Sequence, residues 1–134
     1  MSIKRYFATA DNTITNAFNG DLSTRATGSN AGAADVVEIF SIYGQAATSS
    51  AEASRALVQF NTAQINTDRV SGLIPASGEV SFYLKLFNVS HIETTPRNYT
   101  LAIQAVSQSW EEGNGLDLDT REDLTYDVVG SNWI

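Results

Sequence analysis

The strongest constraint on the fold is a strict alternation of residue types over residues 79–89, EVSFYLKLFNV. A period of two is typical of a β-strand with one face in a core. One face carries the apolar side chains of Val80, Phe82, Leu84 and Leu86. The other face carries Ser81, Tyr83, Lys85, Phe87 and Val89. Because two of these are aromatic residues on a face that water would otherwise cover, we expect another surface to pack on them.

Four further segments have the composition of strands. They are residues 3–8, 36–43, 54–61 and 98–106. Nowhere do apolar residues recur with helical spacing over the dozen residues that a stable helix needs, so we expect no helix. The nearest approach to a helical pattern, residues 49–60, ends in an alternating Val-Gln-Phe and is assigned to β structure.

Two stretches between these strands, residues 16–34 and 44–53, are rich in small and polar residues. Such a composition predicts long surface loops. Several short strands joined by polar loops favour an all-β fold, and we expect an antiparallel β-sandwich that resembles a jelly roll. With 134 residues the chain fits a single domain, residues 1–134, that buries roughly two-thirds of its unfolded surface.

The charge and composition of the chain exclude several classes of partner. The net charge is −7, and residues 111–134 hold seven acidic residues and one basic residue. Nucleic-acid binding needs the opposite sign along a continuous surface, so it is not expected. No apolar run approaches the ~20 residues of a membrane helix, and no apolar region follows the N-terminal charges as in a secretory signal. The chain has no cysteine, so neither a disulfide nor a thiolate metal site is expected.

The acidic tail contains one candidate metal site. Asp117, Asp119, Glu122 and Asp123 lie close together in sequence. Carboxylates at this density supply hard oxygen ligands for Ca²⁺, although their spacing differs from that of an EF-hand loop. The alternative is a solvated acidic segment that keeps the protein soluble. Apart from calcium, we expect no cofactor.

The sequence does not favour catalysis. His91 is the only histidine, and the chain has neither a cysteine nor a G-x-S-x-G motif. Glu111, Glu112 and Asp117 flank a Gly-Asn-Gly loop, whereas a glycosidase needs two carboxyl groups held rigidly across a cleft. We therefore expect a protein that acts by binding and is not an enzyme.

Four aromatic residues are candidates for a binding surface: Tyr83, Phe87, Trp110 and Trp133. Aromatic faces stack on the apolar faces of sugar rings, so these residues are glycan-binding candidates. The alternative is that they pack the sandwich or a contact between subunits, because aromatic residues contribute strongly to cores and interfaces alike. Since large aromatic residues are usually well buried, we favour packing.

Several short motifs occur in an order that resembles a known family. The chain contains DNTI at residues 11–14, RALVQF at 55–60, VSFYLKLFNV at 80–89, and WEEG at 110–113 followed by Trp133. These motifs resemble the disaggregatase-related, or DNRLRE-type, β-sandwich domains, and the likeness covers nearly the whole chain. The sequence segments DNTITNAF, VEIFSIYGQ and SWEEGNGLD are also similar to segments of virion structural proteins of tailed phages.

This resemblance implies a β-sandwich located in the virion. The implied role is a capsid decoration or cement protein that binds the major capsid protein or other virion proteins, with the tail or fibre as the other implied location. The apolar residues on outer strand faces predict self-association into a symmetric homo-oligomer such as a trimer. Because the wider family is associated with polysaccharide binding, the alternative is a carbohydrate-binding module or tail adhesin domain.

The sequence also departs from the family pattern at its end. Family members continue for tens of residues beyond the Trp-containing dipeptide, whereas this sequence ends at Ile134. We therefore expect either a short version of the domain or the N-terminal part of a longer protein. A sandwich without its final strand has an open edge, and open edges pair with neighbouring chains.

Overall fold

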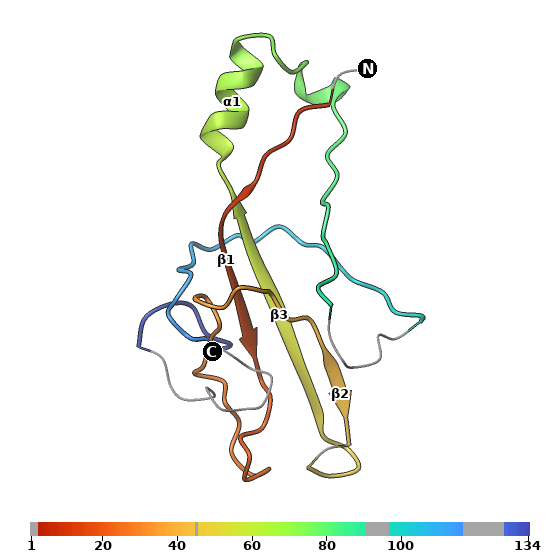
Figure 1. Ribbon diagram of the computed structural model, residues 1–134, viewed down its shortest axis with the longest axis vertical. Coiled ribbons are helices and arrows are strands. Elements are labelled where there is room, and N and C mark those ends of the chain that lie inside the picture. The colour runs from red at the N-terminus through yellow and green to blue at the C-terminus, as the bar shows by residue number, and fades with distance from the viewer. Residues whose placement is uncertain (1–2, 45, 91–96, 117–127) are drawn as a thin grey trace.

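The computed structural model describes residues 3–44, 46–90, 97–116 and 128–134 (Figure 1). Its regular elements are β1 (Ala8–Thr15), β2 (Ser41–Tyr43), β3 (Ala51–Phe60), α1 (Thr62–Val70) and a short 3-10 helix (Ser77–Glu79). The three strands form one antiparallel sheet in the order β1-β3-β2. Strand residues outnumber helical residues, so the prediction of a β-rich, antiparallel fold is confirmed at this level.

The central strand of the sheet is β3 (Figure 1). The strand predicted at residues 54–61 is confirmed, and in the structure it begins earlier, at Ala51. β1 pairs with it antiparallel and begins at Ala8, where the strand predicted at residues 3–8 was expected to end. β2 pairs with residues 51–53 on the other side. The alternating sequence of β3 thus forms a strand because each of its edges has a partner.

Three other predicted strands are unpaired in the described chain or shorter than predicted. Within the described chain, residues 79–89 and 98–106 form no strand, although both run as extended segments (Figure 1). Of the strand predicted at residues 36–43, only Ser41–Tyr43 is paired. A β-strand needs hydrogen bonds to a neighbouring backbone as well as alternating side chains, and the extended segments lack such a neighbour among the described residues.

The buried layer of the protein is more polar than apolar. Among the described residues, the buried apolar side chains are those of Ile14, Ala17, Ala26, Ala31 and Ile74. The buried polar side chains are those of Asn12, Thr13, Thr15, Ser29, Asn30, Glu52, Ser54 and Asp68. Buried polar groups are stable only when they are hydrogen-bonded, so hydrogen bonds provide much of the cohesion of this layer.

The loop at residues 16–34 contributes to this layer, contrary to the prediction that it lies on the surface. The Ala31 amide donates a hydrogen bond to the Thr13 carbonyl of β1 (2.9 Å). Ala26 and Ala31 are buried together, and Phe40 packs against them. Because its side chains are small, the backbone of the loop packs directly against β1. Larger side chains would hold the two backbones apart.

One helix, α1, forms where none was predicted. The Asn61 side chain caps its N-terminus by accepting a hydrogen bond from the Gln64 amide (3.0 Å). Gly72 follows its end with a φ of 76°, a conformation that favours glycine. α1 has nine residues and few apolar ones, so apolar spacing does not detect it. Neither helix in the described part of the chain has the length and apolar character needed to cross a membrane.

The buried Asp68 of α1 holds the N-terminal segment against the helix. Its carboxylate accepts hydrogen bonds from the Tyr6 hydroxyl (2.8 Å) and from Gln64 Nε2 (2.9 Å). It also forms an ion pair with Lys4 Nζ (3.1 Å). The segment that precedes β1 is therefore positioned by one carboxylate.

Acidification is expected to release this N-terminal segment. The hydrogen bond from Tyr6, followed by that from Lys4, holds the pKa of Asp68 below its ordinary value. A carboxyl group with a lowered folded-state pKa contributes stability that is complete above its unfolded-state pKa, about 3.9, and is lost as the pH falls through the folded-state pKa. The Tyr6 ring signals in nuclear magnetic resonance spectra should shift at pH 7 in Asp68→Ala, and in the wild type only below about pH 4.

The exposed Glu79 provides the matched control for this measurement. Glu79→Ala removes a carboxylate without touching the contacts of Asp68, so the Tyr6 signals should follow those of the wild type. Tyr6 signals that are identical in Asp68→Ala and the wild type at pH 7 would contradict the assigned role of Asp68.

Candidate functional site

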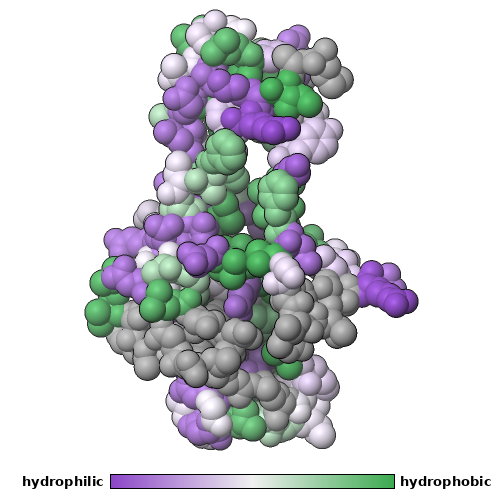
Figure 2. All heavy atoms as spheres, in the orientation of Figure 1, coloured by the Kyte–Doolittle hydropathy of each residue, from purple (hydrophilic) through white to green (hydrophobic). Residues whose placement is uncertain are grey.

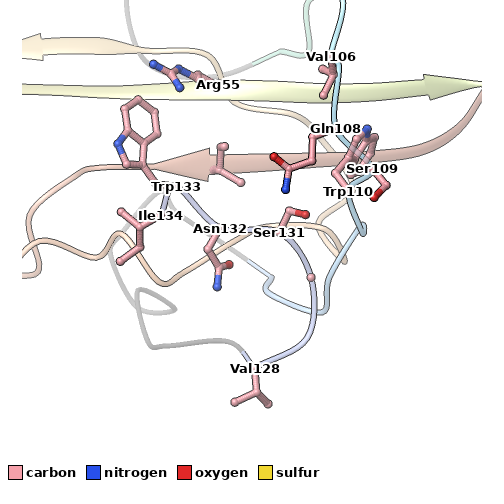
Figure 3. A pocket seen from close by; sticks show the side chains of 12 residues that line it. Arg55, Val106, Gln108, Ser109, Trp110, Val128, Ser131, Asn132, Trp133 and Ile134 are labelled. Atoms are coloured by element: carbon pink, nitrogen blue, oxygen red, sulfur yellow. The ribbon is translucent and has the colours of Figure 1, made fainter.

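An open groove of about 620 Å³ lies where the C-terminal segment meets the sheet (Figure 3). It is lined by Ile14, Arg55, Val106, Gln108, Ser109, Trp110, Val128, Gly130, Ser131, Asn132, Trp133 and Ile134. The lining combines two indole rings with amide, hydroxyl and guanidinium groups. A concave surface of this volume that mixes aromatic and polar groups is typical of a site for a small ligand.

The side chain of Asn30 joins the buried loop to the C-terminal segment. It is fully buried, and its Nδ2 donates to the Val129 carbonyl (3.0 Å) and to Asn132 Oδ1 (2.9 Å). Its Oδ1 accepts a hydrogen bond from the Gly115 amide (3.1 Å). One amide group therefore fixes two segments that lie far from it in sequence, and Asn132 of the groove is one of its partners.

Asn12 of β1 makes a second link of the same kind. Its Nδ2 donates to the carbonyl of Ser131 (2.9 Å) and, at longer distance, to that of Glu111 (3.4 Å). Its Oδ1 accepts a hydrogen bond from the Ala31 amide (3.2 Å). Because Asn12 is fully buried, each of these bonds replaces one that water would otherwise make. The strand, the loop and the C-terminal segment thus meet at two asparagines.

Three glycines allow the chain segments to cross at this point. Gly113 and Gly130 have φ values of 92° and 100°, which favour glycine. A Cβ on Gly113 would overlap the Asn30 side chain, and a Cβ on Gly130 would overlap the backbone of Gly113. A Cβ on Gly32 would likewise overlap the backbone of Glu112. The backbone that forms the groove is therefore packed too closely for any side chain at these positions.

Trp133 is held at its backbone and at its ring. Its amide donates to the Thr27 carbonyl (3.0 Å), which fixes the backbone. The Arg55 guanidinium of β3 lies over the indole, 4.2 Å from the ring centroid. A cation over an indole face is attracted by the negative potential of the ring. Figure 3 shows both side chains at the same end of the groove.

Two carboxyl groups lie near each other outside the groove lining. Glu112 Oε1 accepts a hydrogen bond from the Asp11 amide (2.8 Å). The pKa of Asp11 is raised, first by its partial burial and then by the negative charge of Glu112. Neither residue belongs to the groove lining, so this pair provides no acid and base on either side of a ligand there.

The structure separates the four aromatic candidates into two pairs. Trp110 and Trp133 are both half-buried and line the same groove, although they are far apart in sequence. Tyr83 and Phe87 are 89% and 77% exposed, on the extended segment at residues 80–90. Only Lys85, 4.6 Å from the Phe87 ring centroid, is in ring contact with this second pair within the described chain. The predicted role in packing is therefore more consistent with the half-buried Trp110 and Trp133 than with the exposed Tyr83 and Phe87.

Sequence reasoning missed the groups that build the groove, namely Asn12, Asn30, Arg55 and Asn132. Arg55 lies in the alternating segment that predicted β3, but alternation does not indicate a ligand site, and the only sequence signal of the other three is an asparagine placed among small residues. That signal is too common to identify a site. Their role depends on contacts between distant segments, so no local pattern could have revealed it.

The predicted calcium ligands Asp117, Asp119, Glu122 and Asp123 lie outside the described residues, as does His91. Within the described ranges, no group of three or more His, Cys, Asp or Glu side chains is placed to hold a metal ion. Comparisons with protein-family models, with curated proteins and with solved structures find no match to this chain. The groove and the exposed extended segments are therefore interpreted from their own chemistry.

Proposed function

We propose that this protein is a structural component of a phage virion, a capsid decoration protein that attaches by protein–protein contacts and by self-association. The observation that supports this most strongly is the large accessible surface of the isolated chain. Its motifs add support, because SRALVQF and SWEEGNGLD resemble those of virion structural proteins of tailed phages. The accessible surface supports assembly, and the resemblance supports the virion as its place.

The isolated chain exposes 10137 Å². A compact monomer of this length exposes about 6,900 Å², so the chain has roughly 3,000 Å² in excess. A standard protein interface hides about 800 Å² on each partner, whereas an obligate interface hides about 1,000–2,500 Å² or more on each. The excess is therefore of the size that a permanent assembly removes from water.

Much of this excess surface is apolar. Figure 2 shows apolar residues distributed among polar ones over the visible face of the molecule. On the segments at residues 80–90 and 97–106, the exposed apolar side chains include those of Phe82, Tyr83, Leu86, Phe87, Tyr99, Leu101 and Ile103. Exposed apolar surface on this scale is characteristic of proteins that function in assemblies.

We also propose that the three-stranded sheet is one layer of an antiparallel, jelly-roll-like β-sandwich. The segments at residues 79–89 and 98–106 have the alternating sequence of sandwich strands, and both are extended. In a sandwich their apolar faces would pack about 10 Å from the first sheet. Assembly provides the backbone partners that these segments lack among the described residues.

Addition of the purified protein to phage particles that lack it tests this function. We expect the protein to sediment with the particles in a fixed copy number and to be present in the protein inventory of intact virions. A matched control is the variant Val70→Ser, which changes an exposed apolar residue of α1 outside the extended segments. A protein that neither sediments with particles nor occurs in virions would overturn the proposal.

A second candidate function, carbohydrate binding, is favoured by one observation: two tryptophans and several polar side chains share the groove. If the groove binds a polysaccharide, Trp110→Ala should weaken binding about tenfold or more, because a stacking face is lost. Tyr83→Ala, outside the groove, should leave binding unchanged. Calorimetric titration with a panel of polysaccharides measures both, and a panel that yields no binding to the wild type would eliminate this candidate.

A further inference from the structure

We propose that residues 80–89 pair as an antiparallel β-strand with the same residues of a second copy of this chain, across a two-fold axis. The proposal rests on the proposed function in one respect, namely that the protein self-associates. It adds the surface that is used, the secondary structure that forms there and the register of the pairing.

The backbone of this segment is unpaired. Among the described residues, no hydrogen bond, from backbone or side chain, involves any of residues 80–90. Val80 has the φ and ψ of a β-strand, −122° and 135°, and the segment continues as an extended chain (Figure 1). An extended segment with a free row of N–H and C=O groups is a template for pairing with another strand.

Both faces of the segment are exposed as well. Phe82 and Leu86 on one face are 64% and 50% exposed, and Tyr83 and Phe87 on the other are 89% and 77% exposed. A strand at the surface of a complete sandwich would have one covered face and one polar face. Two exposed apolar faces therefore indicate that a partner covers at least one of them, in addition to pairing with the backbone.

The chemistry of the segment favours a second copy of this chain as the partner. The chain as a whole has a net charge of −7, but residues 80–89 contain a single charged side chain, Lys85. Two copies can therefore approach here without the repulsion that their acidic regions would cause. The roughly 3,000 Å² of excess surface is also sufficient for the large interface of an obligate homo-oligomer.

Alternation and charge together select a register. If Leu84 lies on the two-fold axis, each Phe82 faces Leu86 of the other copy and each Lys85 faces Tyr83. Side chains of the same face then meet, because the paired positions differ by an even number. The two lysines avoid each other, and each ammonium group lies beside a tyrosine ring, a favourable cross-strand pair.

Because the chain has no cysteine, disulfide trapping tests this register directly. Residues opposite each other in an antiparallel pair have Cα atoms about 4.5–5.5 Å apart, within the range of a disulfide. Under mild oxidation, Leu84→Cys should therefore be trapped as a covalent dimer for the majority of the protein. A mixture of Tyr83→Cys with Lys85→Cys should form the mixed dimer in preference to either symmetric one. Val70→Cys on α1, where the side chain is 81% exposed compared with 41% for Leu84, should remain monomeric on a non-reducing gel.

The native mass of the same samples, measured by sedimentation, separates the two proposals. An oligomer in which Leu84→Cys is not trapped would overturn the strand pairing and leave the assembly function standing. A protein that is monomeric at high concentration would overturn both. As a second variant, Phe82→Asp combined with Leu86→Asp should raise the dissociation constant about a hundredfold or more, and the circular dichroism of the sheet should be lost at a correspondingly higher protein concentration. An unchanged dissociation constant would also overturn the pairing.

Discussion

Replacement of Asn30 by alanine is expected to lower the free energy of unfolding by about 3–5 kcal/mol. The substitution removes the hydrogen bonds that the Asn30 side chain makes with the Val129 carbonyl, with Asn132 Oδ1 and with the Gly115 amide. Gly115 is buried, so its unpaired amide costs about 1–3 kcal/mol, whereas each of the two part-buried bonds contributes roughly 0.5–1.5 kcal/mol, and the losses are not additive. Because a domain of this size has a total stability of about 5–15 kcal/mol, this variant should be close to unfolding.

Urea denaturation, followed by tryptophan fluorescence at one fixed protein concentration, measures this effect. Asn66→Ala is the matched control, because Asn66 is exposed on α1 and its replacement changes the stability by less than about 0.5 kcal/mol or increases it slightly. The variant Asn30→Asp distinguishes the contribution of the accepted hydrogen bond from that of the donated ones. It keeps the oxygen that accepts from the Gly115 amide and loses the Nδ2 group that donates two bonds. A loss of less than 1 kcal/mol in Asn30→Ala would show that the asparagine does not hold the C-terminal segment.

The melting temperature of the protein is expected to fall by on the order of 10 °C when the protein is diluted a hundredfold. The described residues of the isolated chain bury few apolar side chains, and three of them are alanines. Such a core contributes too little free energy to offset the conformational entropy of the described residues that surround it, so folding should be coupled to assembly. For a protein folded only as an oligomer, each tenfold dilution removes about 1.4 kcal/mol of stability.

Differential scanning calorimetry over a range of protein concentrations provides the measurement. The double variant Phe82→Asp, Leu86→Asp is an informative comparison, because it should melt at a lower temperature than the wild type at every concentration. A melting temperature that does not change on dilution, together with the sedimentation mass of a monomer, would show that the isolated chain is stable alone. In that case the excess surface would need an explanation other than assembly.

Several features of the fold could be predicted from local sequence. The alternation in SRALVQF correctly predicted β3, and the predominance of strand over helix was also predicted correctly. In contrast, α1 was missed because its stability comes from the Asn61 cap and the contacts of Asp68, and these leave no apolar stripe. The loop at residues 16–34 was placed on the surface because its small residues cannot form a large apolar core, yet they are what allows it to pack on β1.

Part of the candidate site was predictable as well. Trp110 and Trp133 could be selected as candidates from their residue type alone, since large aromatic residues are rarely without a partner. The sequence could not show that Trp110 and Trp133 line one groove while Tyr83 and Phe87 lie elsewhere. This arrangement depends on Asn12 and Asn30, which join segments that are distant in sequence.

Alternation is a relation between residues two positions apart, so the amino-acid order alone could indicate candidate strands, and it identified β3. Whether such a segment becomes a strand depends on a second backbone at hydrogen-bonding distance, and only the three-dimensional arrangement determines where that backbone is. β3 finds two partners within its own chain, whereas residues 80–89 find none among the described residues. The groove is a product of tertiary structure for the same reason, because the hydrogen bonds that form it join residues about a hundred positions apart.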